Sequence, residues 1–213
     1  MSRRIPLFPL PGVVLLPGTL LPLHIFEPRY KTMVGDALAG NRTIGMAMLK
    51  PGWEGREASP AIYPVGGAGE IIESEALEDG RYNILLEGRF RYRILEEAAL
   101  GPYRAASVEE IASVPFSTSG EERRISRTAR KLFEVIRGEL DLAAIPETPL
   151  SPERLASELA LRLGYSPEEL QTLLETDSVP ARFGTLIARM LEWQRRIRFL
   201  APFRPPDPDV TRN

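Results

Sequence analysis

The sequence contains no cysteine and a single histidine, His24. Without cysteine the chain cannot form disulfides, thiolate metal sites, iron–sulfur clusters or a cysteine nucleophile. One histidine leaves few ways to build a zinc site. We therefore expect no metal site and no cofactor.

Lysine is also scarce, and the short motifs of common enzymes are missing. Only Lys31, Lys50 and Lys131 occur, and none follows a glycine, which excludes the phosphate-binding loop of P-loop ATPases. No Gly-x-Ser-x-Gly elbow is present, and no lysine lies in a recognisable Ser-Lys motif. His24 is the one candidate for a general base near neutral pH, but no set of partners is visible, which favours a structural role. The sequence predicts no catalytic residue and a protein that is not an enzyme.

Long hydrophobic runs are absent as well. No segment approaches the roughly 20 apolar residues that span a bilayer. The apolar run after Arg3 and Arg4 is interrupted by four prolines and then by charged residues, unlike a signal peptide. The net charge of −2 gives no global attraction for nucleic acid or for an anionic membrane. We expect a cytoplasmic protein that contacts no membrane and whose main partner is not nucleic acid.

What the chain does contain falls into two halves with different periodicity. Short apolar runs broken by glycine and proline extend to about residue 115, and they predict strands with one short helix from Pro28 to a stop at Gly40. The runs lie at 5–10, 13–16, 20–26, 43–49, 70–95 and 103–111. From residue 119 the period is 3.6, which predicts a helical bundle over 119–201, and 202–213 is a proline-rich tail. The predicted class is α+β: a mostly antiparallel β-barrel over 1–115, then the α-helical bundle.

The clearest hairpin lies within residues 70–95, and two turn lengths compete. A two-residue turn at Asp79-Gly80 would place two glutamates opposite apolar residues and bury them. A three-residue loop over residues 78–80, with Gly80 in the left-handed region, avoids that burial. We predict the second register, which places Ile72, Ser74 and Ala76 opposite Leu86, Ile84 and Tyr82.

The helical half carries three N-cap signals. In two of them a serine is followed three positions later by glutamate, the pattern of a capping box. The predicted N-caps are Ser119 with Glu122, Ser151, and Ser166 with Glu169, and a fourth helix is predicted to start near Ser178.

Arginines alternate along the second strand of the predicted hairpin. Arg89, Arg91 and Arg93 share one face, where three guanidiniums could follow the phosphates of RNA. The aromatic residues between them, Phe90 and Tyr92, point to the opposite face and cannot stack bases beside these arginines. We favour a solvated exterior paired with nearby glutamates, and keep RNA binding through this row as the alternative.

Trp53 lies in a charged loop at residues 50–60 that is punctuated by glycine and proline. A large aromatic residue in such a loop either anchors the loop on the strands or contacts a partner. Aromatic residues are favoured as interface anchors, so Trp53 is a candidate binding residue.

Several motifs together resemble one known family, the N-terminal substrate-binding domain of the Lon ATP-dependent protease. They are Ile5-Pro6-Leu7-Phe8-Pro9-Leu10, residues 13–18, Leu21-Pro22-Leu23-His24-Ile25-Phe26-Glu27-Pro28-Arg29-Tyr30, Lys50-Pro51-Gly52-Trp53, Val65-Gly66 with Gly69, Asp79-Gly80-Arg81-Tyr82-Asn83, and Glu87-Gly88 before Arg89-Phe90-Arg91. The match is strong over 5–30, good to about 110 and general to about 200. The resemblance implies a barrel like that of pseudouridine-synthase and archaeosine-transglycosylase domains (PUA-like), followed by a helical bundle. The sequence departs from the family at Gly67-Ala68 and Glu70, where a Cys-Val pair and often a basic residue are usual.

The resemblance also implies a function. In the full protease this domain captures unfolded or degron-bearing polypeptides, while separate ATPase and protease modules do the work, and we expect neither module in this stand-alone protein. Phe26, Arg29 and Tyr30 match the most characteristic motif, and we expect them to hold the short helix to the barrel. With Trp53 they are the candidate substrate-binding residues of a non-catalytic module that binds polypeptides or a protein partner.

Overall fold

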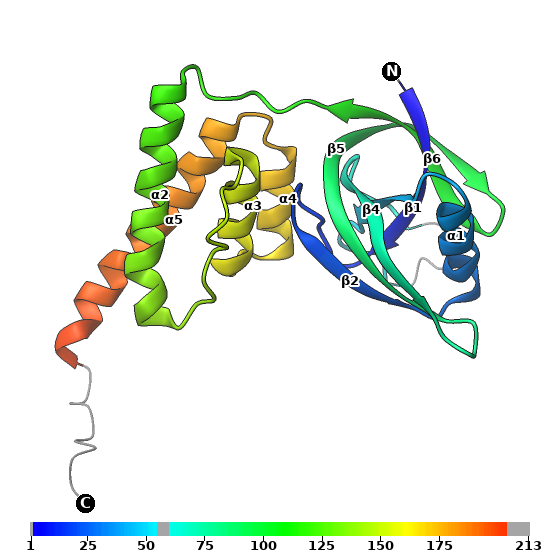
Figure 1. Cartoon of the computed structure of the whole chain (residues 1–213), viewed down its shortest axis with the longest axis horizontal. Helices are drawn as coiled ribbons and strands as arrows, with labels where there is room; N and C mark the ends of the chain where they lie inside the picture. The colour runs from blue at the N-terminus through cyan, green and yellow to red at the C-terminus, as the bar shows by residue number, and fades with distance from the viewer. Residues whose placement is uncertain (1, 55–59, 204–213) are drawn as a thin grey trace, which may run out of the picture.

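The computed structural model describes residues 2–54 and 60–203. Figure 1 shows the strands gathered at one end of the molecule and helices α2 to α5 at the other. The strands are β1 (Ser2–Leu10), β2 (Leu20–Ile25), β3 (Thr43–Met48), β4 (Val65–Ala76), β5 (Tyr82–Leu100) and β6 (Tyr103–Ile111). The helices are α1 (Pro28–Ala39), α2 (Ser119–Leu140), α3 (Pro152–Arg162), α4 (Pro167–Glu175) and α5 (Val179–Leu200), and a 3-10 turn, η1 (Ala201–Phe203), follows. Among the described residues no helix is both long and apolar enough to cross a membrane.

The six strands of the described residues form one sheet, and the last strand in the pairing order pairs back onto the second. The order is β2-β5-β4-β3-β1-β6, and β6 also pairs with β5. This is possible because the 19-residue β5 pairs through its first half with β2 and through its second half with β6. Only β1 and β3 run parallel; the other pairings are antiparallel. The expected α+β class and the mostly antiparallel sheet are confirmed.

Residues 13–16, expected as a strand, form none. Instead this segment passes directly over the sheet, with Leu15 and Leu16 buried. A Cβ added at Gly67 would lie 1.8 Å from the carbonyl oxygen of Leu15, and one at Gly88 would lie 2.2 Å from that of Leu16. Glycine at these two positions lets the segment approach the strands too closely for any side chain between them.

The β4–β5 hairpin has the predicted loop but a different register beyond it. Ala76 pairs with Tyr82, Ser74 pairs with Ile84, and Gly80 has a φ of 75°, as a three-residue loop requires. The prediction that Ile72 lies opposite Leu86 is wrong. A bulge between Ile71 and Glu73 places Ile71 there instead, so Ile72 is left 38% exposed.

Two of the three predicted N-caps are confirmed, and α5 begins beside Ser178 as expected. The Ser151, Ser166 and Ser178 hydroxyls each accept a backbone hydrogen bond at the start of a helix, and Ser166 forms a full capping box with Glu169. The N-cap of α2 is Thr118 rather than Ser119, because the Thr118 hydroxyl accepts the hydrogen bond from the Glu121 backbone.

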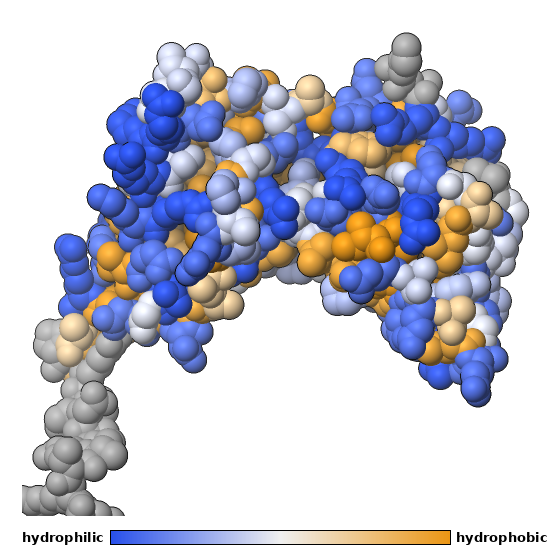
Figure 2. All heavy atoms as spheres, in the orientation of Figure 1, coloured by the Kyte–Doolittle hydropathy of each residue, from blue (hydrophilic) through white to orange (hydrophobic). Residues whose placement is uncertain are grey.

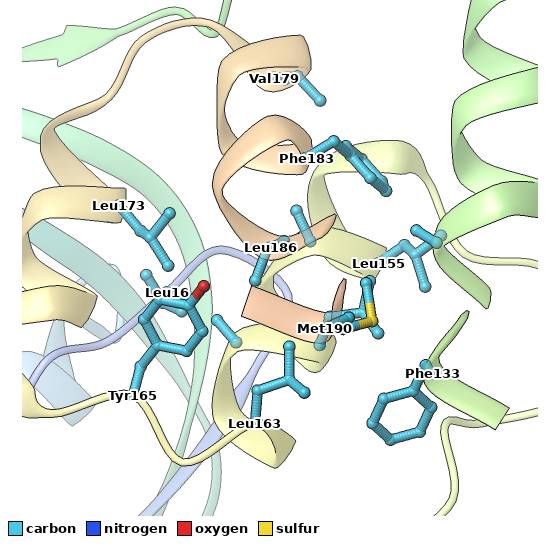
Figure 3. Packing of buried hydrophobic residues seen from close by; sticks show 14 of the residues in the cluster. Leu16, Phe133, Leu155, Leu163, Tyr165, Leu173, Val179, Phe183, Leu186 and Met190 are labelled. Carbon is cyan, nitrogen blue, oxygen red and sulfur yellow. The ribbon is translucent and has the colours of Figure 1, made fainter. Parts of the chain in front are cut away.

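The helices pack around a cluster of buried apolar side chains that includes Phe133, Phe183 and Met190. Leu16, from the segment before β2, reaches into the same cluster from the sheet (Figure 3). The helical core is therefore continuous with Leu16 of the segment that crosses the sheet and with Val65 on β4.

Arg91 links the sheet to the helices. Its side chain is 1% exposed, and it donates to the Leu174 carbonyl at 2.9 Å, to Asp177 Oδ1 at 3.0 Å and to the Ala112 carbonyl at 3.2 Å. The expectation that Arg91 lies on a solvated exterior is wrong, because α4 and the residues after it cover that part of β5. Gln171 on α4 adds a bond to the Val65 carbonyl at 2.9 Å.

Candidate functional site

The open edge of β2 is the candidate site. β2 is the first strand of the sheet order and pairs only with β5 among the described residues. Gly88 donates its backbone N–H to the Thr19 carbonyl at 2.9 Å, which fixes residues 19, 21, 23 and 25 as those bonded to β5. The backbone groups of Leu20, Pro22 and His24 therefore point away from the sheet. Pro22 has no N–H to donate, which is typical of an edge strand.

The side chains along this edge are largely exposed and apolar. Leu20 is 51% exposed, Pro22 and His24 are also exposed, while Ile25 is buried in the core. Phe26, just beyond the strand, is 62% exposed. Figure 2 shows apolar surface over the part of the sheet where β2 lies in Figure 1. The edge thus combines unpaired backbone groups with an apolar border.

His24 is held by hydrogen bonds at both ring nitrogens. Its Nδ1 lies 2.7 Å from Asn83 Oδ1, and its Nε2 lies 3.1 Å from Arg81 Nη1. A guanidinium can only donate, so Nε2 accepts and Nδ1 carries the proton. Asn83 in turn donates to Glu75 at 2.8 Å. These contacts fix the exposed ring of His24 on the strand.

Arg29 and Tyr30 lie in the first turn of α1, which follows β2 in the chain. Tyr30 is buried and packs on Phe8 with ring centroids 4.3 Å apart, and its burial raises the pKa of the Tyr30 hydroxyl. The Arg29 guanidinium lies 4.5 Å from the Tyr30 ring centre and forms an ion pair with Glu27 at 2.8 Å. Tyr30 thus holds α1 to β1, as expected, whereas the exposed Phe26 does not.

A second bond fixes the other side of α1. The Tyr103 hydroxyl on β6 donates to Asp36 Oδ2 at 2.6 Å. Burial, and then the contact with Asp36, raise the pKa of Tyr103 to about 12, so the hydroxyl keeps its proton and its bond at neutral pH. α1 is therefore anchored at both sides, which keeps the end of β2 in place.

Trp53 lies in the turn after β3, and its side chain is 37% exposed. Residues 55–59 of the same loop lie outside the described residues. Within the described part of the chain, no hydrogen bond, ion pair or ring contact joins Trp53 to β2 or α1. The structure therefore joins Arg29 to Tyr30 and leaves Phe26 exposed beside His24, and it does not bring Trp53 to them by any such contact.

The three alternating arginines have three different surroundings. Arg89 pairs with Glu70 at 3.0 Å and with Glu87 at 2.8 Å, as a solvated exterior predicts. Arg93 is exposed, and Arg91 is buried against the helices. Arg91, the middle residue of the row, is therefore too deeply buried to contact a phosphate chain.

Comparison with protein families identifies the chain. A family model described as "ATP-dependent protease La (LON) substrate-binding domain" matches residues 4–192. The chain belongs to this family. The match includes the β2 edge, α1 and most of the helical half.

Full-length Lon proteases are similar to the chain over part of their length. It is 31% identical over 189 residues to the Lon protease of Dictyoglomus thermophilum, covering 84% of this chain and 23% of that protein. It is 29% identical over 188 residues to Lon protease 2 of Bdellovibrio bacteriovorus, covering 85% of this chain and 24% of that protein. The chain spans about a quarter of the length of the curated relatives it matches.

Solved Lon N-terminal domains have the same fold. The Lon N-terminal domain protein from Xanthomonas campestris matches with a TM-score of 0.64 at 22% identity, covering 87% of this chain and 98% of that one. The N-terminal domain of the Mycobacterium avium complex Lon protease matches with a TM-score of 0.66 at 17% identity, covering 88% and 98%.

The sequence did contain a signal for the open edge of this Lon-family domain. Pro22 interrupts an otherwise apolar strand, and such a proline is confined to strand edges, ends or bulges. Nothing in the sequence reports that α4 covers Arg91, because alternation shows which face a side chain takes but not what packs there.

Proposed function

We propose that this chain is a non-catalytic module that binds unfolded or degron-bearing polypeptides, and that an extended client segment adds to the open edge of β2. The observation that carries the proposal is the row of unpaired backbone groups at Leu20, Pro22 and His24 next to exposed apolar side chains. Membership of a substrate-binding family supports it.

The edge offers a bonding pattern that does not depend on the client's sequence. Leu20 and His24 each present an outward N–H, and Leu20, Pro22 and His24 each present an outward carbonyl. An extended segment can bond to these groups through its own backbone, while its side chains contact Leu20 and Phe26. The missing donor at Pro22 weakens the pairing, which suits capture followed by release.

The RNA-binding alternative receives less support. It requires Arg89, Arg91 and Arg93 to contact phosphates together, whereas Arg91 is buried and Arg89 is paired with two glutamates. A PUA-like barrel over 1–115, a separate helical bundle over 119–201 and the tail at 202–213 stay predictions; residues 204–213 of that tail lie outside the described residues. The closed cycle of strand pairings supports the first of these.

The proposal is tested by titrating the protein into labelled, permanently unfolded polypeptide and labelled structured RNA, at low and high salt. We expect polypeptide binding that survives high salt, because apolar and main-chain contacts are little screened. RNA binding without polypeptide binding would contradict the proposal.

Two phenylalanines provide a matched pair of variants. Phe26→Ser removes an exposed ring beside the β2 edge and should weaken polypeptide binding about tenfold. Phe199→Ser removes a ring of similar exposure, 71% against 62%, on α5, and should leave binding unchanged. Trp53→Ala tests the other candidate contact. Equal effects of Phe26→Ser and Phe199→Ser would argue against the β2 edge.

A further inference from the structure

Five cations lie close together on the outer face of α2. Ala129, Phe133 and Ile136 point into the core, and the cations occupy the solvent side of the first half of the helix. We call this surface the α2 cationic face; it consists of Arg123, Arg124, Arg127, Arg130 and Lys131. Figure 2 shows strongly hydrophilic surface where the first half of α2 lies in Figure 1.

These cations have no carboxylate partners within the described residues. The rest of α2 shows that pairing is possible on this helix, since Arg137 pairs with Glu134 at 3.0 Å. Arg123, Arg127 and Lys131 are spaced four residues apart, so like charges face each other along the helix and destabilise it. The arrangement costs stability unless an external anion neutralises it.

Two surface hollows border the cationic face. One, of about 370 Å³, lies along α2 itself and is lined by Gly120, Thr128 and four of the cations. The other, of similar volume, lies between α2 and the start of α3, where Leu150, Pro152 and Leu155 add apolar walls and Glu122 adds one carboxylate. The buried Ser126 hydroxyl oxygen borders the second hollow and has no hydrogen-bond partner within the described residues. A ligand here meets cations and an apolar wall.

The charge on the rest of the chain favours a short acidic ligand over a long nucleic acid. Removing these five from the 27 basic residues leaves 22 against 29 acidic ones, so the rest of the chain carries a net negative charge, which disfavours a long nucleic acid. No aromatic residue belongs to the face, so it offers no base stacking. Arg123 to Lys131 spans about 12 Å along the helix, a length that about four extended residues cover.

We propose that the α2 cationic face docks a short acidic segment of a partner polypeptide. Carboxylates of the segment bond to Arg123, Arg127 and Lys131. The proposal does not rest on the β2 edge, which lies on the sheet at the other end of the molecule (Figure 1).

The test uses the full chain and a labelled peptide with five consecutive glutamates between glycine and serine flanks. A peptide with glutamines in the same positions is its control. We expect the glutamate peptide alone to bind, and its affinity to fall from low salt to physiological ionic strength. The double variant Arg123→Glu, Arg127→Glu should weaken binding at least about tenfold, because it removes two charge-assisted contacts. Arg198→Glu makes the same kind of charge reversal on an exposed arginine of α5 and should leave binding within about twofold.

Each other outcome overturns the proposal. No binding of the glutamate peptide, or equal loss in Arg198→Glu, would remove the assignment to α2. Tighter binding of a DNA duplex that the double variant abolishes would make the occupant nucleic acid. Self-association that the double variant abolishes would make it a second copy of the chain.

Two controls separate failure of this site from loss of folding and from failure of the proposed function. The thermal midpoint of the double variant should not fall, since the substitutions relieve repulsion. The double variant should also bind an uncharged unfolded polypeptide as well as the parent protein does, because that binding uses the β2 edge.

Discussion

Arg91 on β5 donates a hydrogen bond to the Leu174 carbonyl at the end of α4, 2.9 Å away and 83 positions later in the sequence. The same guanidinium contacts Asp177 and Ala112, so one buried side chain joins the sheet, the connecting segment and the helices. Next to it, Val114 pairs with Ser178 in an isolated bridge that ties the connecting segment to the start of α5.

Removing Arg91 should therefore destabilise the protein strongly. Arg91→Ala leaves buried carbonyls without donors, and we expect a loss of about 3 kcal/mol in the free energy of unfolding, measured with urea. Arg89→Ala, on the same strand, removes exposed ion pairs and should cost under about 1 kcal/mol. Similar losses for the two variants would show that Arg91 is not a central link.

Glycines that the segment at 13–16 crosses should tolerate no side chain. In Gly67→Ala the added Cβ would collide with the Leu15 carbonyl, and we expect a loss of about 3 kcal/mol or failure to fold. Gly184→Ala on α5 meets nothing within 4 Å and should instead stabilise the protein by about 0.5–1 kcal/mol. In thermal unfolding, the midpoint should fall for Gly67→Ala and rise for Gly184→Ala.

The N-cap of α2 can be tested by removing one hydroxyl group at a time. Thr118→Ala removes the hydroxyl that accepts from Glu121 and should cost about 1 kcal/mol, whereas Ser119→Ala should cost almost nothing. If Ser119→Ala lost more free energy of unfolding in urea than Thr118→Ala, Ser119 would be the N-cap, as the sequence predicted.

Glu153 on α3 should make stability depend on pH on the acid side. Burial raises the pKa of this carboxyl, but hydrogen bonds from Ser113 and Arg182 and the charge of Arg182 outweigh it, so the net pKa is lowered. Because the unfolded chain takes up the proton at a higher pH than the folded protein, this contribution is present above the usual glutamate pKa. It is lost as the pH falls through the lowered value.

The matching variant is Glu153→Gln. The difference in free energy of unfolding between the parent protein and Glu153→Gln should be largest near neutral pH and shrink as the pH falls through the acid range. A difference that is constant with pH would show that the carboxylate charge contributes nothing.

Local rules predicted much of this fold. Gly80 set the hairpin loop, serine N-caps marked the starts of α3 and α4, and the last apolar run, at 103–111, has the bounds of β6. These features depend on neighbours within a few residues, where backbone chemistry decides the outcome.

The features that the sequence did not predict depend on distant contacts. Ile72 leaves the strand face because a bulge shifts the register, and Leu15 and Leu16 pack over glycines of two other strands. Arg91 is buried by a helix that begins 76 positions later. For the site, the motif that holds Phe26, Arg29 and Tyr30 was recognisable, but the open β2 edge depends on which strands pair.

The most direct test of polypeptide capture at β2 compares two substitutions of one residue. Leu20→Ala removes the side chain and keeps the outward N–H, whereas Leu20→Pro also removes that N–H without touching the bonds to β5. Circular dichroism and thermal unfolding first establish that both variants fold, and each is then titrated into labelled unfolded polypeptide. If client segments pair with the β2 edge, Leu20→Pro binds at least about fivefold more weakly than Leu20→Ala, because a main-chain hydrogen bond is lost. Equal affinities of two folded variants would contradict backbone pairing at β2.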